Sequence, residues 1–297
     1  MRLGFIGIGL MGEPMTLRLL DRGHGLTVWN LTADRYACVE AAGARVAATP
    51  AAVAEASDIV MLCVLDGHAV ENCVFGRGGL ICAQGGARIV VDHSTVNPDL
   101  ARDVAQGLAQ RTGMQWVDAP VSGGPPAARE GALTIMAGGD ADAFAAAEPV
   151  LRDLGAVVTR VGGVGAGQTA KILNQAIVGA GYVLMAEVLA LAEASGIDAA
   201  KLPDCLAGGY ADSRLLQAIY PQMQARAFNP PRGYARQLLK DVKNVAAFAQ
   251  NLDLSLPLIG QAVAQYARYV AQGNEMAASA SISRLYDPQV SDSEMDS

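Results

Sequence analysis

One lysine and two neighbouring amides stand out in a long apolar stretch of the sequence. Lys171 is the only lysine between Gly162 and Ala194, and Asn174 and Gln175 follow it by three and four positions. In a helix, residues with this spacing share a face. A lysine can exchange a proton with a carbonyl or hydroxyl group, so we take Lys171 as a candidate acid/base and Asn174 as its partner. The alternative is a lysine whose ammonium simply reaches solvent.

A polar, glycine-containing segment follows a predicted strand. Residues 118–125 read Asp-Ala-Pro-Val-Ser-Gly-Gly-Pro. The N–H groups of Ser122, Gly123 and Gly124, with the serine hydroxyl, can form a nest for a carboxylate. The position favours this function, since open sheets bind ligands at the carboxyl ends of their strands. The alternative is a plain Ser-Gly-Gly-Pro turn.

A glycine-rich turn near the N-terminus predicts a dinucleotide site. It follows a predicted strand, precedes a helix that starts at Pro14, and consists of Gly7, Ile8, Gly9, Leu10, Met11 and Gly12. Gly7 allows a tight turn, Gly9 lets the backbone approach a pyrophosphate, and Gly12 lets helix and strand pack closely. The N–H groups at the start of the helix then face the phosphates. The alternative is an ordinary glycine-rich loop.

The elements that must position these residues alternate between strand and helix as far as Gly163. We expect strands at 2–7, 26–30, 58–64, 87–91, 115–118, 133–137 and 157–161, with helices at 14–22 and 34–42, after Pro50 and Pro98, and from Asp140. This alternation predicts a parallel sheet covered by helices on both faces.

After Gly163 the sequence predicts helices alone. One long helix runs to Ala194 and joins two domains, although Gly179 and Gly181 interrupt its run of helix-favouring residues. Further helices are expected at about 198–207, 212–225, 236–251, 256–271 and 277–285. We therefore predict a dinucleotide-binding domain at 1–162, an all-helical substrate and oligomerisation domain at 163–289, and a disordered acidic tail at 290–297.

Composition excludes several classes of protein. Of 297 residues, 52% are hydrophobic and 17% charged, and the net charge is −7. These values argue against disorder and against nucleic acid or an anionic membrane as a partner. We see no apolar stretch clean enough to span a bilayer. The five scattered cysteines indicate reduced thiols in a cytoplasmic protein, and the three isolated histidines predict no metal site.

Taken in order, these motifs resemble the β-hydroxyacid dehydrogenase family, which includes 3-hydroxyisobutyrate dehydrogenase and tartronate semialdehyde reductase. The similarity spans about Met1 to Asp287 and includes residues 5–15, 118–124 and 165–174. Lys240-Asp241 matches the last motif of the family, although Val242 stands where the family usually has Leu. Residues 174–178 and 207–213 look most like the tartronate semialdehyde reductase branch.

The resemblance implies a fold and a set of roles. The fold would be an α/β Rossmann-type N-terminal domain and an all-α C-terminal domain, joined by a long interdomain helix. Lys171 would be the catalytic acid/base for a small carboxylate substrate, held by Ser122, Gly123, Gly124 and Asn174. Lys240, Thr95 and Leu65 would contact the cofactor, and Asp66 follows Leu65 where many members have Pro. The protein would be an NAD(P)-dependent reductase of a 2- or 3-hydroxyacid and its semialdehyde, and a homodimer or homotetramer.

The choice of cofactor depends on the end of the second strand. NAD-selective domains carry an acid there, which would repel a 2′-phosphate. Here the residue is Asn30, and Thr32 and Arg35 can also reach a phosphate. Leu31 stands where phosphate-binding relatives usually carry Arg, and Asp34 adds negative charge. We expect use of both NAD and NADP, with a slight lean to NADP.

Two other functions and one specificity residue stay open. Imine reduction uses the same scaffold, but relatives of that kind usually replace the lysine. A non-catalytic cofactor-binding protein would not need Lys171, Asn174 and Ser122 together. Arg214 either selects a second anionic group on the substrate or is a surface arginine.

Overall fold

A computed structural model describes residues 1–231 and 233–287 of the chain. The predicted acidic tail, 290–297, lies outside the described residues. The chain divides into two compact units, Met1–Lys171 and Ile172–Ser297.

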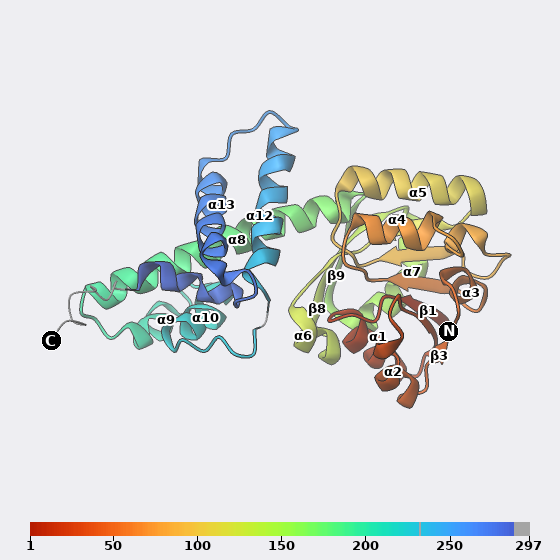
Figure 1. Ribbon diagram of the computed structural model, residues 1–297, viewed down its shortest axis with the longest axis horizontal. Helices are drawn as coiled ribbons and strands as arrows, with labels where there is room; N and C mark the ends of the chain where they lie inside the picture. Colours follow the sequence, from red (N-terminus) through yellow and green to blue (C-terminus); the bar gives the residue numbers. More distant parts are fainter. Residues whose placement is uncertain (232, 288–297) are drawn as a thin grey trace. The chain divides into compact units, whose positions relative to one another are not determined.

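The first unit is built on one sheet (Figure 1). Its strands follow the order β3-β2-β1-β4-β5-β6-β8-β7, and β9 pairs with β8. They are β1 (Arg2–Ile6), β2 (Gly25–Trp29), β3 (Arg45–Val46), β4 (Ile59–Leu62), β5 (Ile89–Asp92), β6 (Gln115–Asp118), β7 (Val121–Ser122), β8 (Leu133–Gly139) and β9 (Gly155–Gly162). Strands β1 to β6 are parallel, in the order of a Rossmann domain. This confirms the predicted fold class.

The expectation of a parallel sheet throughout is wrong at one side. Strand β8 runs antiparallel to both β6 and β7. The chain leaves β7, passes through the short helix α6 (Gly124–Glu130) and re-enters the sheet at the same end. Alternation of strands and helices does not by itself fix the strand direction, because that depends on the end of the sheet to which each connection returns.

The strands alternate their side chains between two apolar layers, as a pleated strand requires. Leu3 and Phe5 of β1 pack with the helices of one layer, while Ile6 packs in the other. The first layer includes α1 (Gly12–Asp21), α6 and α7 (Ala141–Leu154), and the second includes α3 (Pro50–Glu55), α4 (Gly67–Phe75) and α5 (Pro98–Thr112). Figure 1 shows α4 and α5 side by side. The connection after β2 holds η1 (Ala33–Arg35) and α2 (Ala37–Ala41). Helices α4 and α6 and strands β3 and β7 were not expected from the sequence.

The long helix α8 (Ala166–Ala194) is continuous, as predicted. Gly179 and Gly181 allow close packing in the second unit. A Cβ at Gly179 would lie 2.1 Å from Cγ1 of Val242, and one at Gly181 would lie 2.4 Å from Cδ1 of Leu215. These contacts bring other helices of the unit directly against the α8 backbone.

The rest of the second unit is helical, as expected. It contains η3 (Ala199–Lys201), α9 (Leu202–Leu206), α10 (Arg214–Ala218), α11 (Tyr220–Gln224), α12 (Ala235–Gln250), α13 (Pro257–Tyr269), η4 (Val270–Asn274) and η5 (Ser279–Tyr286). The single helix predicted at 212–225 is two short ones, because Pro221 has no N–H to continue a helix and stands in the first turn of α11. The helix predicted at 277–285 is a 3-10 helix.

Helix α8 also corrects the expectation about membrane-length segments. By length and composition it could cross a bilayer, with a mean hydropathy of 1.7 over its most apolar window. Core helices of soluble proteins share these properties. Here Met185, Ala186 and Leu189 of α8 are buried in the apolar cluster of the second unit.

Candidate functional site

The carboxyl edge of the sheet gathers the predicted residues of the first unit. The glycine turn follows β1, Asn30 follows β2, Thr95 lies three residues after β5, and Ser122 ends β7. Ligands of doubly wound sheets bind at this edge.

The three glycines of the turn take the positions that a dinucleotide needs. Gly7 has a φ of +98°, and a Cβ there would lie 2.2 Å from the carbonyl oxygen of Cys63. A Cβ at Gly12 would lie 1.8 Å from the carbonyl oxygen of Gly7, so helix and turn are in direct contact. At Gly9 a Cβ would meet no described atom within 4 Å, which leaves open space beside the backbone.

The start of helix α1 completes this part of the site. In the described chain no side chain caps the helix at Met11. Within the first turn the N–H of Glu13 donates to the carbonyl oxygen of Gly9 at 3.0 Å, and Pro14 has no N–H. The N–H of Gly12 is therefore the one that the start of the helix offers to a phosphate. The open space at Gly9 and the uncapped helix together fit a dinucleotide.

Asn30 holds the turn to the end of β2. Its Oδ1 accepts a hydrogen bond from the N–H of Ile8 at 2.9 Å. Its Nδ2 donates to the carbonyl oxygen and the hydroxyl of Thr32, at 2.9 and 3.0 Å. The hydroxyl of Tyr36 lies 2.7 Å from both the N and the O of Asn30. The amide hydrogens of Asn30 are thus used within the protein, which leaves Thr32 and Arg35 as the nearer donors for a phosphate.

Exposed side chains surround the same edge. Leu10, Leu31 and Leu65 are 62%, 85% and 79% exposed, and Arg35 is exposed at the end of η1. Exposed leucines at several positions of one edge offer apolar contact to a bound molecule.

Lys171 reaches the segment that the sequence predicted for substrate binding. The side chain is buried, and its Nζ donates a hydrogen bond to the carbonyl oxygen of Val121 at 2.9 Å. Ser122 follows Val121 in β7, and Gly123 and Gly124 have φ angles of +132° and +75°. Helix α6 begins at Gly124, with no side-chain cap in the described chain. The structure therefore brings the candidate acid/base next to the candidate carboxylate site.

A buried polar network connects the start of α8 to the ends of β5 and β6, and its residues were not predicted as site residues from the sequence. Gln168 accepts a hydrogen bond from the N–H of Val96 at 3.1 Å and donates to the carbonyl oxygen of Ser94 at 2.7 Å. It thus holds the backbone on both sides of Thr95. Asp118 accepts bonds from the start of α8. The available signal was the position of Asp118, a charged residue at the end of an apolar strand.

Two titratable groups in this network have strongly shifted pKa values. Burial raises the pKa of Asp92 to about 7, and the N–H and hydroxyl of Ser94 oppose the shift. Burial lowers the pKa of His93 to about 4. His93 is therefore neutral at pH 7, with its Nδ1 2.7 Å from the carbonyl oxygen of Ala119.

The second unit joins two of the predicted motifs. Asn174 donates to Gln175 at 2.7 Å, and Gln175 donates to Asp241 at 2.6 Å. Lys240 lies 3.4 Å from the Asp241 carboxylate. The polar face of α8 and the Lys-Asp motif of α12 therefore form one chain of polar contacts. Arg214 is the exposed first residue of α10.

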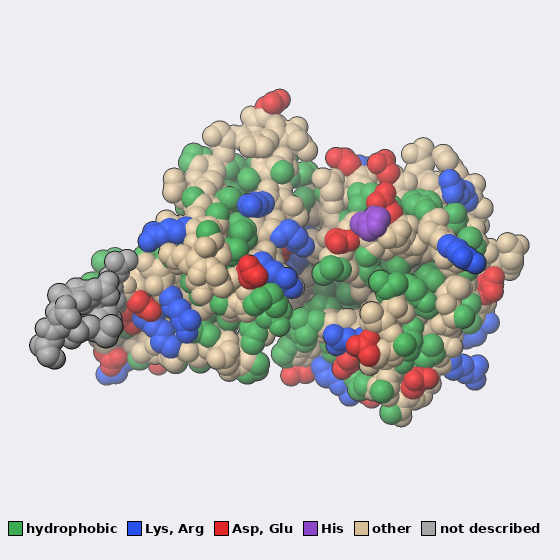
Figure 2. Space-filling view, in the orientation of Figure 1, with side chains coloured by type: hydrophobic (Ala, Val, Ile, Leu, Met, Phe, Trp, Pro, Cys, Tyr) green, Lys and Arg blue, Asp and Glu red, His purple; other side chains and the backbone are tan. Residues whose placement is uncertain are grey.

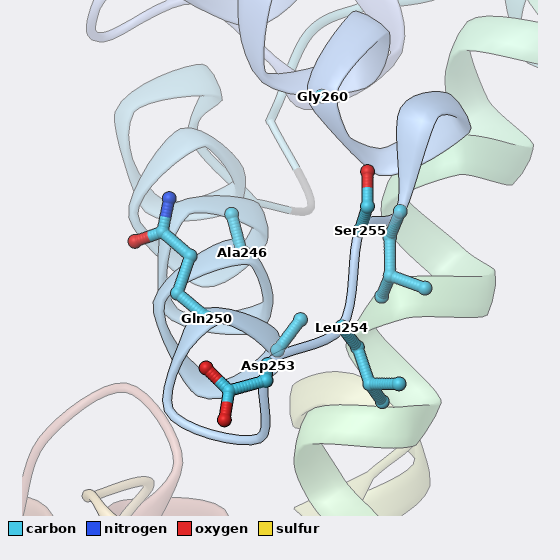
Figure 3. A pocket seen from close by; sticks show the side chains of 8 residues that line it. Ala246, Gln250, Asp253, Leu254, Ser255 and Gly260 are labelled. Atoms are coloured by element: carbon cyan, nitrogen blue, oxygen red, sulfur yellow. The ribbon is translucent and has the colours of Figure 1, made fainter.

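A hollow of about 440 Å³ lies in the second unit, between the end of α12 and the start of α13 (Figure 3). Gln250, Asp253 and Ser255 are the polar residues among those that line it. None of the residues predicted for catalysis or cofactor binding lines this hollow.

Among the described residues, no group of three or more His, Cys, Asp and Glu side chains could hold a metal ion. Figure 2 shows Lys and Arg interspersed with Asp and Glu over the face that it presents.

Comparison with known proteins decides the family. Residues 2–163 match the family described as "NAD binding domain of 6-phosphogluconate dehydrogenase". Residues 165–286 match "NAD-binding of NADP-dependent 3-hydroxyisobutyrate dehydrogenase". The 2-hydroxy-3-oxopropionate reductase of Escherichia coli (strain K12) is 39% identical over 260 residues, which cover 86% of this chain and 87% of that protein. The chain belongs to the 3-hydroxyisobutyrate dehydrogenase family.

Solved structures agree with this assignment. The 3-hydroxyisobutyrate dehydrogenase of Mycobacterium tuberculosis, solved with L-serine, is 28% identical, with a TM-score of 0.86 and coverage of 96% of this chain and 99% of that one. Psf3, solved with NADP+ and 2-OPP, is 25% identical, with a TM-score of 0.84 and coverage of 95% and 99%. This dehydrogenase is an NAD(P)-binding oxidoreductase that acts on CH–OH groups, as the sequence predicted.

Proposed function

We propose that this dehydrogenase interconverts a small 2- or 3-hydroxyacid and its semialdehyde, with Lys171 as proton donor and acceptor. The observation that carries the proposal is the 2.9 Å hydrogen bond from Lys171 Nζ to the carbonyl oxygen of Val121. It places a buried ammonium group directly beside the segment that ends in Ser122, Gly123 and Gly124.

The carboxylate of the substrate binds at Ser122, Gly123 and Gly124. The hydroxyl of Ser122 and the N–H groups of Gly123 and Gly124 are the donors. Pro125 and Pro126, in the first turn of α6, have no N–H to add to them. Asn174 follows Lys171 by one turn of α8 and holds the oxygen on the reacting carbon. A carboxylate and a reacting oxygen fixed at two points define the orientation of a small substrate.

Lys171 acts on the oxygen of the reacting carbon. The bound nicotinamide supplies or accepts the hydride. In the direction of reduction, negative charge develops on the carbonyl oxygen, and the Lys171 ammonium stabilises that charge and then gives it a proton. The interaction is stronger in the transition state than with the neutral carbonyl, which is the condition for catalysis. In oxidation the amine takes the hydroxyl proton.

The dinucleotide binds at the glycine turn. The pyrophosphate lies beside Gly9 at the start of α1, in the turn that Gly7 and Gly12 make possible. Thr95 and Leu65 contact the cofactor. The backbone on both sides of Thr95 is held by Gln168. Lys240 lies beside the nicotinamide.

The cofactor is NAD(P), with a slight lean to NADP. Asn30 is neutral, so no acid at this position repels a 2′-phosphate. The exposed Arg35 guanidinium and the Thr32 hydroxyl are the donors for the phosphate, and Asp34 weakens the lean. Psf3, the relative solved with NADP+, supports this reading.

Arg214 is proposed to select substrates with a second anionic group. Its guanidinium is exposed at the first residue of α10 and is able to pair with a carboxylate or phosphate. A surface arginine without this role would leave the preference between dicarboxylic and monocarboxylic substrates unchanged on substitution.

A substrate panel tests the proposed function against the two alternatives. The relatives described above suggest 2-hydroxy-3-oxopropionate, 3-hydroxyisobutyrate and L-serine as members of the panel, to which cyclic imines are added. Absorbance of NAD(P)H reports turnover in each direction. The proposal expects turnover of at least one hydroxyacid or semialdehyde and none of the imines. Turnover of imines alone would make the protein an imine reductase, and cofactor binding without any turnover would indicate a non-catalytic role.

A further inference from the structure

Asp118 connects the last parallel strand of the sheet to the start of helix α8. Its Oδ1 accepts a hydrogen bond from the N–H of Gly165 at 2.7 Å, and its Oδ2 accepts one from the N–H of Gln168 at 2.9 Å. The side chain is fully buried. Asp118 therefore has no access to a substrate, and both of its oxygens are occupied by the backbone that leads into the helix.

The same residue begins the segment that Lys171 contacts. Val121 lies three residues after Asp118, and Lys171 lies three residues after Gln168 on α8. The Lys171 Nζ donates to the carbonyl oxygen of Val121 at 2.9 Å. The contacts form a closed ring from the Asp118 carboxylate through α8 to Lys171, across to Val121, and back along the chain to Asp118.

The backbone around this ring is closely packed. A Cβ at Gly167 would lie 2.4 Å from the carbonyl oxygen of Met136, 2.6 Å from that of Asp118 and 2.9 Å from Asp118 Oδ2. The α8 backbone thus rests directly on β6 and β8, and a shift of the Asp118 side chain moves the helix start. Such tightly packed groups transmit displacement.

We propose that Asp118 is a positioning residue for catalysis, which holds Lys171 in register with the segment 121–124 by fixing the first turn of α8. The inference rests on the proposed role of Lys171. It goes beyond that role, because the position of the proton donor then depends on the Asp118 carboxylate, which does not contact the substrate.

The neighbouring strand provides a matched control. Asp92 pairs in register with Asp118, is of the same residue type and is also fully buried. Its Oδ1 accepts from the N–H of Ser94 at 2.9 Å, and among the described residues its Oδ2 has no hydrogen-bond partner. The substitution Asp92→Asn therefore measures how much kcat changes when a buried carboxyl at this edge becomes an amide and no contact with α8 is lost.

The experiment is a double-mutant cycle with Asp118→Asn and Lys171→Ala in the full-length enzyme, and Asp92→Asn as the control. Asparagine keeps the shape but turns an NH2 group toward one of the two backbone N–H groups. We expect Asp118→Asn to lower kcat about 10- to 100-fold, the scale of a misplacement of about 1 Å. The Kd for NADPH should stay within about threefold, since the glycine turn is not touched. In the Lys171→Ala background the same change should lower kcat by less than about twofold, because the two residues act as one unit.

Several results would overturn the inference. A folded Asp118→Asn enzyme with parental kcat would do so, as would an Asp92→Asn enzyme that loses as much activity as Asp118→Asn. An undiminished effect of Asp118→Asn in the Lys171→Ala background would show a general structural role. If Asp118→Asn does not fold, Gly167→Ala displaces the same turn from the helix side and takes its place in the cycle, with the same expected result. If Lys171→Ala alone keeps parental kcat, the proposed function fails, which is distinct from failure of the inference.

Discussion

The two halves of the sheet edge are built in different ways. At the glycine turn the backbone makes the site, and the side chains around it are exposed, with Leu10 at 62% and Leu31 at 85%. Around the start of α8 the side chains make the site. There Asp118 and Gln168 are fully buried and Lys171 is 9% exposed.

This difference indicates how each half fails. A site made of backbone and open space loses affinity when a side chain at its rim changes, but its shape stays. A site held by buried hydrogen bonds loses position when one bond is removed, because the orphaned partner must move or stay unsatisfied. Changes in the first half should therefore appear in cofactor Kd, and changes in the second half in kcat.

Substitution of Gln168 should affect both halves of the edge, that is, both the Kd for the cofactor and kcat. It extends from α8 but bonds to Ser94 and Val96, on both sides of Thr95. Gln168→Met keeps the length and removes both bonds, and two buried backbone groups lose their partners at about 1–3 kcal/mol each. We expect a lower Tm, a Kd for NADPH raised about tenfold and a lower kcat. Thermal unfolding, cofactor titration and steady-state kinetics measure the three effects.

The control for this change is Gln106→Met, at an exposed position of α5. It should match the parent in all three measurements. A Gln168→Met enzyme with lower stability but parental Kd for NADPH would separate Gln168 from the cofactor half.

The buried Asp92 makes the stability of the protein depend on pH, which gives a further test of the buried half of the edge. Burial raises its pKa to about 7, whereas in the unfolded chain an aspartate titrates near about 3.9. Between these values the folded protein keeps a proton that the unfolded chain has lost. The contribution of Asp92 to the free energy of unfolding of the parent therefore falls as pH rises from about 4 to about 7.

Asp92→Asn removes this dependence because an amide does not titrate. Relative to the parent, the variant should gain stability by on the order of a few kcal/mol between about pH 4.5 and about pH 7.5, with no further gain above. Denaturant unfolding at a series of pH values measures the gain, and the His93 contribution cancels because both proteins contain it. A stability difference that does not change with pH would mean that Asp92 stays ionised in the folded protein.

Arg35 should give the smallest effect, confined to the cofactor half. A charge-assisted bond to phosphate is worth about 1.5–3 kcal/mol when well formed, and an exposed one is worth less. We expect Arg35→Ala to lower the ratio of kcat/KM for NADPH over NADH by up to about tenfold. The parental ratio should favour NADPH slightly. A parent that prefers NADH by tenfold or more would reverse the lean, and an unchanged ratio would exclude Arg35.

Much of the site could be predicted because its signals are local in sequence. The glycine turn combines three glycines with a strand before and a helix after, and Lys171 with Asn174 is a polar pair in an apolar helix. Local patterns of this kind determine local structure, and the fold class followed from the alternation of strands and helices.

The rest could not be predicted because it depends on partners distant in the chain. Asp118 bonds to groups 47 and 50 residues away, and Gln168 to groups 72 and 74 residues away. Helix α6 was not predicted because Gly124, Pro125 and Pro126 suggest a turn. Proline is nevertheless compatible with the first turn of a helix. The direction of β8 is likewise a property of the whole sheet edge.

The central claim is that Lys171 supplies the proton, and the single-turnover rate of NADPH oxidation in Lys171→Ala tests it most directly. Substrate and cofactor are saturating, and the Kd for NADPH is measured on the same sample. The control is Lys201→Ala, a surface lysine paired with Asp198, which should keep the parental rate. The account predicts that Lys171→Ala lowers the rate by about 10²–10⁴-fold, while the Kd stays within about threefold of the parent. A rate within about tenfold of the parent would contradict it.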